Sequence, residues 1–165
     1  MVSGGGQYES NATATLTAVP DDCYKFVRWD DGNTDNPRLV VVAGNESYSA
    51  VFEPITYVVL WKDVDGTTLE TDSILCGTMP NCDGETPTKP ATVEYTYIFK
   101  GWIPEIVAVT SDTTYIAQFD SVKNMYEVTW VNAEGGELSK DSLEYGAMPD
   151  YNGETPKKDS TTVYA

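Results

Sequence analysis

The sequence contains no histidine among its 165 residues. Histidine is the commonest general base and a frequent zinc ligand, so its absence excludes Ser-His and Cys-His catalytic arrangements. Carboxylates remain as candidate acid–base groups, but no pair of them stands out from the acids scattered through the loops. The sequence therefore favours a protein that is not an enzyme.

Basic residues are also scarce, with 10 Lys and Arg against 26 Asp and Glu and a formal net charge of −16. Such a charge repels nucleic-acid phosphates and anionic lipid surfaces, so we expect no nucleic-acid partner. Long apolar runs are missing too, because the longest spans only residues 39–43. We therefore expect no membrane insertion, and the opening MVSGGG has none of the features of a signal peptide.

What the sequence does contain is a repeat. GTMPNCDGETPTK at 77–89 returns as GAMPDYNGETPKK at 146–158, an offset of 69 residues. The same offset brings Tyr57 onto Tyr126 and Trp61 onto Trp130. Repeats of this kind predict a chain built from similar small modules.

The later part of the repeat reappears near the N-terminus. YIFKGW at 97–102 is echoed by YKFVRW at 24–29, and YIAQF at 115–119 by YSAVF at 48–52. We therefore predict three modules, of which the first is divergent, the second complete and the third only a first half: 1–53, 54–123 and 124–165.

The local patterns are those of β-strands. TYVVLWK at 56–62 alternates in polarity, and Asp65-Gly66 predicts a hairpin turn before a second strand at 67–75. A second hairpin is predicted from 96–102 and 113–119, with a bulge at Gly101 that redirects Trp102. The prolines and glycines of 76–94 make a helix improbable between the two hairpins.

The aromatic residues admit two interpretations. In a row on the surface they make a carbohydrate-binding platform, whereas inside alternating strands they form the core that so small a module needs. Their fixed positions within the repeats favour the core. The residues assigned to the repeat core are Tyr57, Trp61, Phe99, Trp102, Tyr115, Phe119, Phe26, Trp29, Phe52 and Trp130.

These motifs together resemble a known family. The order Y-x-V-x-W, D-G-x-x-L, G-x-M-P, G-E-T-P, Y-x-F-x-G-W and Y-x-A-x-F is similar to the internalin-type B repeat, also called the Listeria–Bacteroides repeat. It runs through 56–120 and over the first half of the repeat at 125–165. Residues 4–53 resemble its divergent relative, marked by LTAVP, Y-x-F-x-x-W and Y-x-A-x-F.

The resemblance implies an all-β fold of small β-grasp-like modules in an elongated tandem array. It also implies a non-catalytic region of a bacterial cell-surface or secreted protein, acting as a spacer or stalk, or in adhesion and protein–protein contact. The partner is then a host or bacterial surface protein or a glycan, and the location is extracellular, with the signal and anchor outside this fragment. The alternative is a carbohydrate-binding module that uses exposed aromatic residues.

No cofactor or metal is expected. DVDG at 63–66 suggests a calcium loop, but the glycine is fourth and residue twelve is Ile74, whereas an EF-hand requires glycine sixth and glutamate twelfth. The second copy reads NAEG at 132–135, which keeps the turn glycine and loses both aspartates. The pattern indicates a hairpin turn.

The cysteines carry one further hypothesis. Cys76 aligns with Tyr145 and Cys82 with Tyr151, so the two positions change residue type together between copies. A pair that changes together suggests contact, which predicts a Cys76–Cys82 disulfide in an oxidising compartment. The alternative is two reduced cysteines in a loop, and Cys23 has no evident partner.

The third module raises the question of what covers it. Its predicted hairpin at 126–144 carries Tyr126, Val128 and Trp130 on one face, and a lone two-stranded hairpin is marginal in water. The candidates are the second module, a neighbouring molecule, or the first module of another copy. We favour self-association through this module, and head-to-tail strand exchange with a first module is its sharper form.

Overall fold

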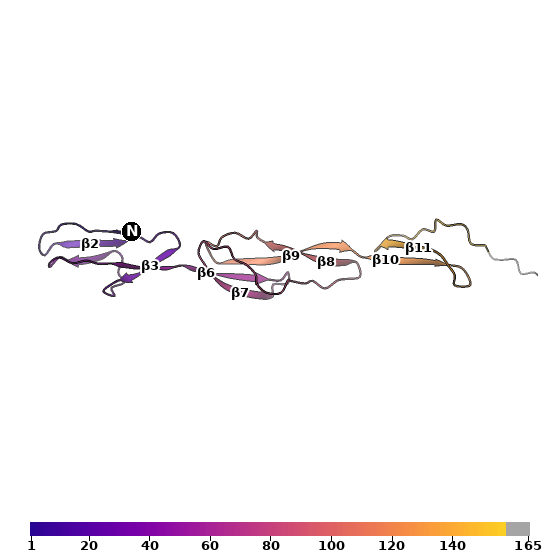
Figure 1. Cartoon of the computed structure of the whole chain (residues 1–165), viewed down its shortest axis with the longest axis horizontal. Helices are drawn as coiled ribbons and strands as arrows, with labels where there is room; N and C mark the ends of the chain where they lie inside the picture. The colour runs from indigo at the N-terminus through magenta and orange to yellow at the C-terminus, as the bar shows by residue number, and fades with distance from the viewer. Residues whose placement is uncertain (158–165) are drawn as a thin grey trace, which may run out of the picture. The chain divides into compact units, whose positions relative to one another are not determined.

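The computed structural model describes residues 1–157, and all regular structure in that part of the chain is β (Figure 1). The all-β fold expected from the sequence is confirmed. Eight residues of the predicted third module, 158–165, lie outside the described residues. The strands are β1 (Val2–Ser3), β2 (Thr13–Ala18), β3 (Tyr24–Trp29), β4 (Arg38–Val41), β5 (Ala50–Pro54), β6 (Thr56–Lys62), β7 (Thr68–Leu75), β8 (Tyr95–Ile103), β9 (Thr113–Lys123), β10 (Met125–Val131) and β11 (Glu137–Glu144).

The chain forms two compact units. The first unit comprises Met1–Glu85 and Trp102–Ala117, and the second comprises Thr86–Gly101 and Gln118–Ala165. Strands β8 and β9 contribute residues to both units, so the division passes through the second sequence module. The module boundaries at residues 53 and 123 stay a prediction.

Two small sheets build the N-terminal part of the first unit. The strand order β1-β2-β4 makes one sheet, and the β3–β5 pair makes the other. Alternation along β2 points Ala14, Leu16 and Ala18 inward. These three apolar side chains pack with Val40 around Trp29, which is completely buried.

A second core lies around β6 in the same unit. The hairpin of β6 and β7 turns at Gly66, whose φ of 89° is a conformation that glycine adopts without strain. On its other side β6 pairs with β9 in parallel, in the sheet order β7-β6-β9-β8. Val59 and Trp61 are fully buried there, and Tyr115 and Trp102 pack on Trp61.

The region around Gly101 matches part of the sequence expectation. Gly101 has a φ of 136°, and Trp102 is half-buried directly after half-buried Gly101, so the alternation breaks there. Trp102 thereby reaches Trp61, at 4.9 Å between ring centroids. The preceding segment, 76–94, contains no helix, as predicted.

The second unit holds the hairpin of β10 and β11. Its register repeats that of β6 and β7 at an offset of 69 residues, including an irregularity after the tryptophan, at Trp61/Lys62 and Trp130/Val131. The predicted hairpin at 126–144 is therefore confirmed. In the same unit Phe99 and Phe119 pack edge to face, with ring centroids 5.8 Å apart.

Candidate interaction site

The disulfide of the first unit differs from the predicted one. Cys76 is bonded to Cys23, with Cα atoms 5.2 Å apart, and Cys82 is a free cysteine. The predicted Cys76–Cys82 bond is wrong. The joint change to tyrosine does not indicate contact, because the two positions have different neighbours. The second copy shows this as well, since Tyr145 lies against Tyr126 and Tyr151 lies against Trp130.

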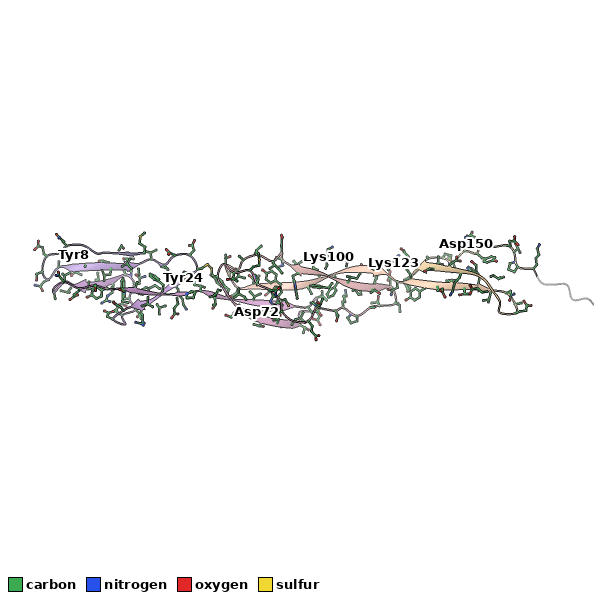
Figure 2. The ribbon with its side chains drawn as sticks, in the orientation of Figure 1. Tyr8, Tyr24, Asp72, Lys100, Lys123 and Asp150 are labelled. Carbon is green, nitrogen blue, oxygen red and sulfur yellow. A yellow bond between two sulfur atoms is a disulfide. The ribbon has the colours of Figure 1, made fainter. Side chains whose placement is uncertain are left out.

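The Cys23–Cys76 disulfide lies at the connection between the first and the second predicted module. Ile55 stands between β5 and β6, its N–H donates to the carbonyl of Cys23, and its own carbonyl accepts from the N–H of Cys76. The β3–β5 pairing and the β6–β7 hairpin bring these three residues together, since Tyr24 pairs with Pro54 and Thr56 pairs with Leu75. We call the set of Cys23, Ile55 and Cys76 the first junction; Tyr24, the residue after Cys23, is labelled in Figure 2.

The same arrangement recurs in the second unit without cysteine. Asn124, at the position of Ile55 in the repeat, donates its N–H to the carbonyl of Glu94 and accepts from the N–H of Tyr145. The Asn124 side chain donates to the carbonyls of Thr92 and Val93, and the Tyr126 hydroxyl also donates to Val93. We call the set of Glu94, Asn124 and Tyr145 the second junction.

A pocket of about 550 Å³ opens in the N-terminal part of the first unit. Its floor is made by Ala14, Leu16 and Val40 of the core, and its two walls are the chain segments 4–8 and 43–48. Gly4 fixes the first wall, because a Cβ there would lie 2.0 Å from the carbonyl oxygen of Thr15. Tyr8, labelled in Figure 2, donates its hydroxyl to the Gly4 carbonyl and holds the loop.

The comparisons with known proteins bear on this part of the chain. Residues 1–56 match the family model of the divergent InlB B-repeat domain. This segment is a divergent B-repeat. No curated protein matches the chain, and no solved structure matches it. The match indicates a repeat domain of the kind that surface proteins carry, and such repeat domains point to a non-catalytic role.

In the divergent B-repeat, the second wall of the pocket carries Tyr48. Its motif YSAVF aligns Tyr48 with Tyr115 of YIAQF. Tyr115 is buried and stacked on Trp61 at 4.7 Å, whereas Tyr48 is half-buried and stacks under the Arg38 guanidinium at 4.7 Å. The hydroxyl of Tyr48 donates to Glu46, and this bond raises the pKa of Tyr48.

The aromatic residues assigned to the repeat core differ in burial. Trp29, Trp61 and Tyr115 are buried, and the remaining seven are half-buried: Tyr57, Phe99, Trp102, Phe119, Phe26, Phe52 and Trp130. Trp29 and Trp61 are therefore unavailable for a surface platform. The indole N–H of Trp61 donates to Asp72 at 2.8 Å, and that of Trp130 donates to Asp141 at the same distance. Asp72 is labelled in Figure 2.

Cys82 is shielded although it is free. Its thiol donates to Glu70 at 3.1 Å and packs against the core around Trp61. Burial, with the Glu70 hydrogen bond, raises the pKa of Cys82 to about 11. The same hydrogen bond lowers the pKa of Glu70. A thiol with so high a pKa is protonated at neutral pH, so Cys82 is a poor nucleophile.

The acidic turns are explained without a ligand. Asp65 accepts from the N–H of Thr67, which lowers the pKa of Asp65, and Asp63 accepts from the N–H of Val64. Within residues 1–157, no group of three His, Cys, Asp or Glu side chains is placed to hold a metal ion. That described part of the chain also contains no helix able to cross a membrane.

Proposed function

We propose that this chain is a non-catalytic repeat region of a bacterial cell-surface or secreted protein, acting as a spacer that carries contact surfaces for other proteins. The observation that carries the proposal is the repeated junction. At both junctions a single residue, Ile55 or Asn124, has its backbone N–H and carbonyl hydrogen bonded to residues that directly adjoin the flanking strands. A connection with both backbone groups bonded resists bending, unlike a flexible linker.

The first junction supports the proposal further through its covalent bond. Cys23 precedes β3 and Cys76 follows β7, so the disulfide ties the β3–β5 pair to the β6–β7 hairpin across the connecting residue. A disulfide of this kind is typical of proteins in oxidising compartments, which agrees with an extracellular location. The partner, whether a surface protein or a glycan, is proposed from the family resemblance alone.

Residual dipolar couplings test the stiffness of the first junction. We expect amides of β2–β5 and of β6–β7 to fit one alignment tensor in the wild-type chain. Inserting Gly-Gly-Ser after Ile55 should give two tensors, whereas the same insertion after Gly44, in an exposed loop, should leave one. Two independent tensors in the wild type would contradict the spacer. The elongated shape of the array stays a prediction. Small-angle scattering of the oxidised chain, which measures its overall dimensions, tests it.

The carbohydrate-binding alternative draws less support. A sugar platform requires several exposed rings in one plane. Two of the four tryptophans, Trp29 and Trp61, have an exposed fraction of 0%. We therefore favour the spacer, and glycan-array binding that is lost on changing Trp102 or Trp130 would reverse this preference.

A further inference from the structure

In the complete repeat, strand β9 of the second hairpin pairs with strand β6 of the first. In β9, residues 113–116 pair in parallel with residues 59–62 of β6, and Tyr115 lies opposite Trp61. The indole of Trp61 thereby becomes fully buried between Tyr115 and Trp102. The motif YIAQF begins inside this parallel pairing, at Tyr115.

The divergent B-repeat has the same motif with no strand at that place. Its equivalent of 113–116 is 46–49, which is not a strand, and β5 begins only at Ala50. Among the described residues, β5 is hydrogen bonded to β3 alone. Since a strand needs a partner for its backbone groups, 46–49 stays irregular while its edge is unpaired.

The pocket lies along this unpaired segment. Residues 43–48 form one wall, and the floor of Ala14, Leu16 and Val40 is apolar. Tyr48, the equivalent of Tyr115, lines the pocket from the same segment. The space beside Tyr48 thus corresponds to the space that Trp61 fills beside Tyr115.

The chain carries a second strand with the pattern of β6. Strand β10 repeats Tyr-x-Val-x-Trp. Among the described residues it forms a strand pairing with β11 alone, which leaves unpaired the edge that β6 presents to β9. Val128 and Trp130 are only half-buried, although their equivalents Val59 and Trp61 are fully buried. Strand β10 therefore has the pattern of the strand that residues 46–49 do not pair with.

We propose that β10 of one copy adds in parallel to residues 46–49 of a second copy, with Trp130 seated in the pocket beside Tyr48. The β6–β9 register, shifted to these positions, places Val128 opposite Glu46, Trp130 opposite Tyr48 and Val131 opposite Ser49. The contact is strand addition, in which backbone hydrogen bonds give affinity and the side-chain pocket gives specificity. Because donor and acceptor are different surfaces, the contact is head-to-tail and does not close at a dimer.

Charge gives the association a salt dependence. Each copy has a formal net charge of −16, so two copies repel each other at low ionic strength. Raising the salt concentration screens this repulsion, and we expect association to strengthen from low to physiological salt. A contact held by ion pairs would instead weaken over that range.

The test uses two variants of the full chain, each of which removes one side of the contact. Trp130→Ala removes the donor side chain, and its matched control is Met125→Ala, at the exposed start of the same strand and outside the paired residues 128–131. Gly44→Trp is chosen to block the pocket, because Gly44 lines it and a Cβ there meets no neighbouring atom within 4 Å. Leu39→Trp on the exposed face of β4 is its control. Sedimentation velocity over a concentration series measures the mass of the assemblies.

We expect wild type and both controls to form growing assemblies, and each variant to associate at least about tenfold more weakly. Mixing the two variants should restore a dimer and nothing larger, because one copy keeps its donor and the other its acceptor. This restoration also shows that both variants are folded. A wild type that is monomeric at all concentrations would overturn the proposal, as would association that neither variant changes. Association lost in Trp130→Ala, kept in Gly44→Trp and not restored on mixing would show pairing between third modules, and would also overturn it.

Discussion

The hairpins β6–β7 and β10–β11 have nearly the same design and different surroundings. They share the strand register, the irregularity after the tryptophan and the indole-to-aspartate hydrogen bond. Yet Val59 and Trp61 are fully buried, whereas Val128 and Trp130 remain half-buried. The difference shows that local sequence specifies the hairpin, while the strands that cover it decide how much apolar surface leaves water.

What covers Trp130 differs in kind from what covers Trp61. Trp61 lies against Tyr115 and Trp102, which belong to strands distant in the sequence. Trp130 lies against Tyr151, at 5.3 Å between ring centroids, from the loop that follows its own hairpin. The tyrosine stands where the complete repeat has Cys82, and its larger ring covers part of the indole.

Truncating the two tryptophans should separate the hairpins most strongly. Trp61→Ala leaves a cavity in a closed core, and we expect unfolding of the first unit to become easier by about 3–5 kcal/mol. Trp130→Ala removes a ring already in contact with water, so the expected loss is about 1 kcal/mol. Chemical denaturation of dilute samples, followed by circular dichroism, measures both. Equal losses would mean that Trp130 is covered as completely as Trp61.

Removing the disulfide should weaken only the first junction. The bond closes a loop with a sequence separation of 53, so Cys23→Ser with Cys76→Ser should lower the unfolding free energy of the first unit by about 2–4 kcal/mol. Reducing agent should have the same effect on the wild type and none on the double variant. Non-reducing peptide mapping identifies the bond, and a Cys76–Cys82 peptide would contradict the structure.

The aspartates that accept from the indoles provide a smaller and matched comparison. Asp72→Ala leaves the N–H of a buried indole without its acceptor, which should cost about 1.5–3 kcal/mol. Asp141→Ala exposes the half-buried indole of Trp130 to water, which replaces the acceptor, so the expected cost is below about 1 kcal/mol. Thermal unfolding of each variant beside the wild type gives the values. A larger cost for Asp141→Ala would reverse the ranking.

The smallest effect concerns Cys82. Its pKa of about 11, against an ordinary 9.0, predicts alkylation at pH 8 about 100-fold slower in the folded than in the unfolded chain. Glu70→Gln removes the charge that opposes ionisation and should speed the reaction. Because the folded pKa is raised, the stabilisation is present below pH 9 and is lost as pH rises toward 11. Equal rates in the folded and unfolded chain would show that the thiol is not shielded.

Part of this structure was predictable from sequence because it depends on local pattern. The turn at Gly66, the absence of a helix from 76 to 94, and the repeat of the 56–75 hairpin at 125–144 follow from residue alternation and turn chemistry. The burial of Trp29 and Trp61 followed from their fixed positions in the repeats. These features require no knowledge of distant contacts.

The disulfide was not predicted, since it depends on two registers at once. Cys23 lies one residue before the β3–β5 pairing and Cys76 one residue after the β6–β7 pairing. The two cysteines are recognised as neighbours only when both registers are known and are joined at Ile55, the residue between β5 and β6. The signal was present in the sequence as two successive strands, 50–54 and 56–62, that are separated by one connecting residue. The pocket beside Tyr48 was not predicted either, because it arises from a pairing that 46–49 does not make.

Native-state hydrogen exchange tests the central claim most directly, namely that the two hairpins are alike in design and differ in how they are covered. Each amide of β6 and β7 is compared with the amide 69 residues later, after correction for neighbouring side chains, in samples dilute enough to be monomeric. We expect protection at least about tenfold greater in β6–β7, since opening it also exposes the core around Trp61. Equal protection at matched positions would mean that the covering strands add nothing to the stability of the hairpin, and that the two hairpins do not differ as described.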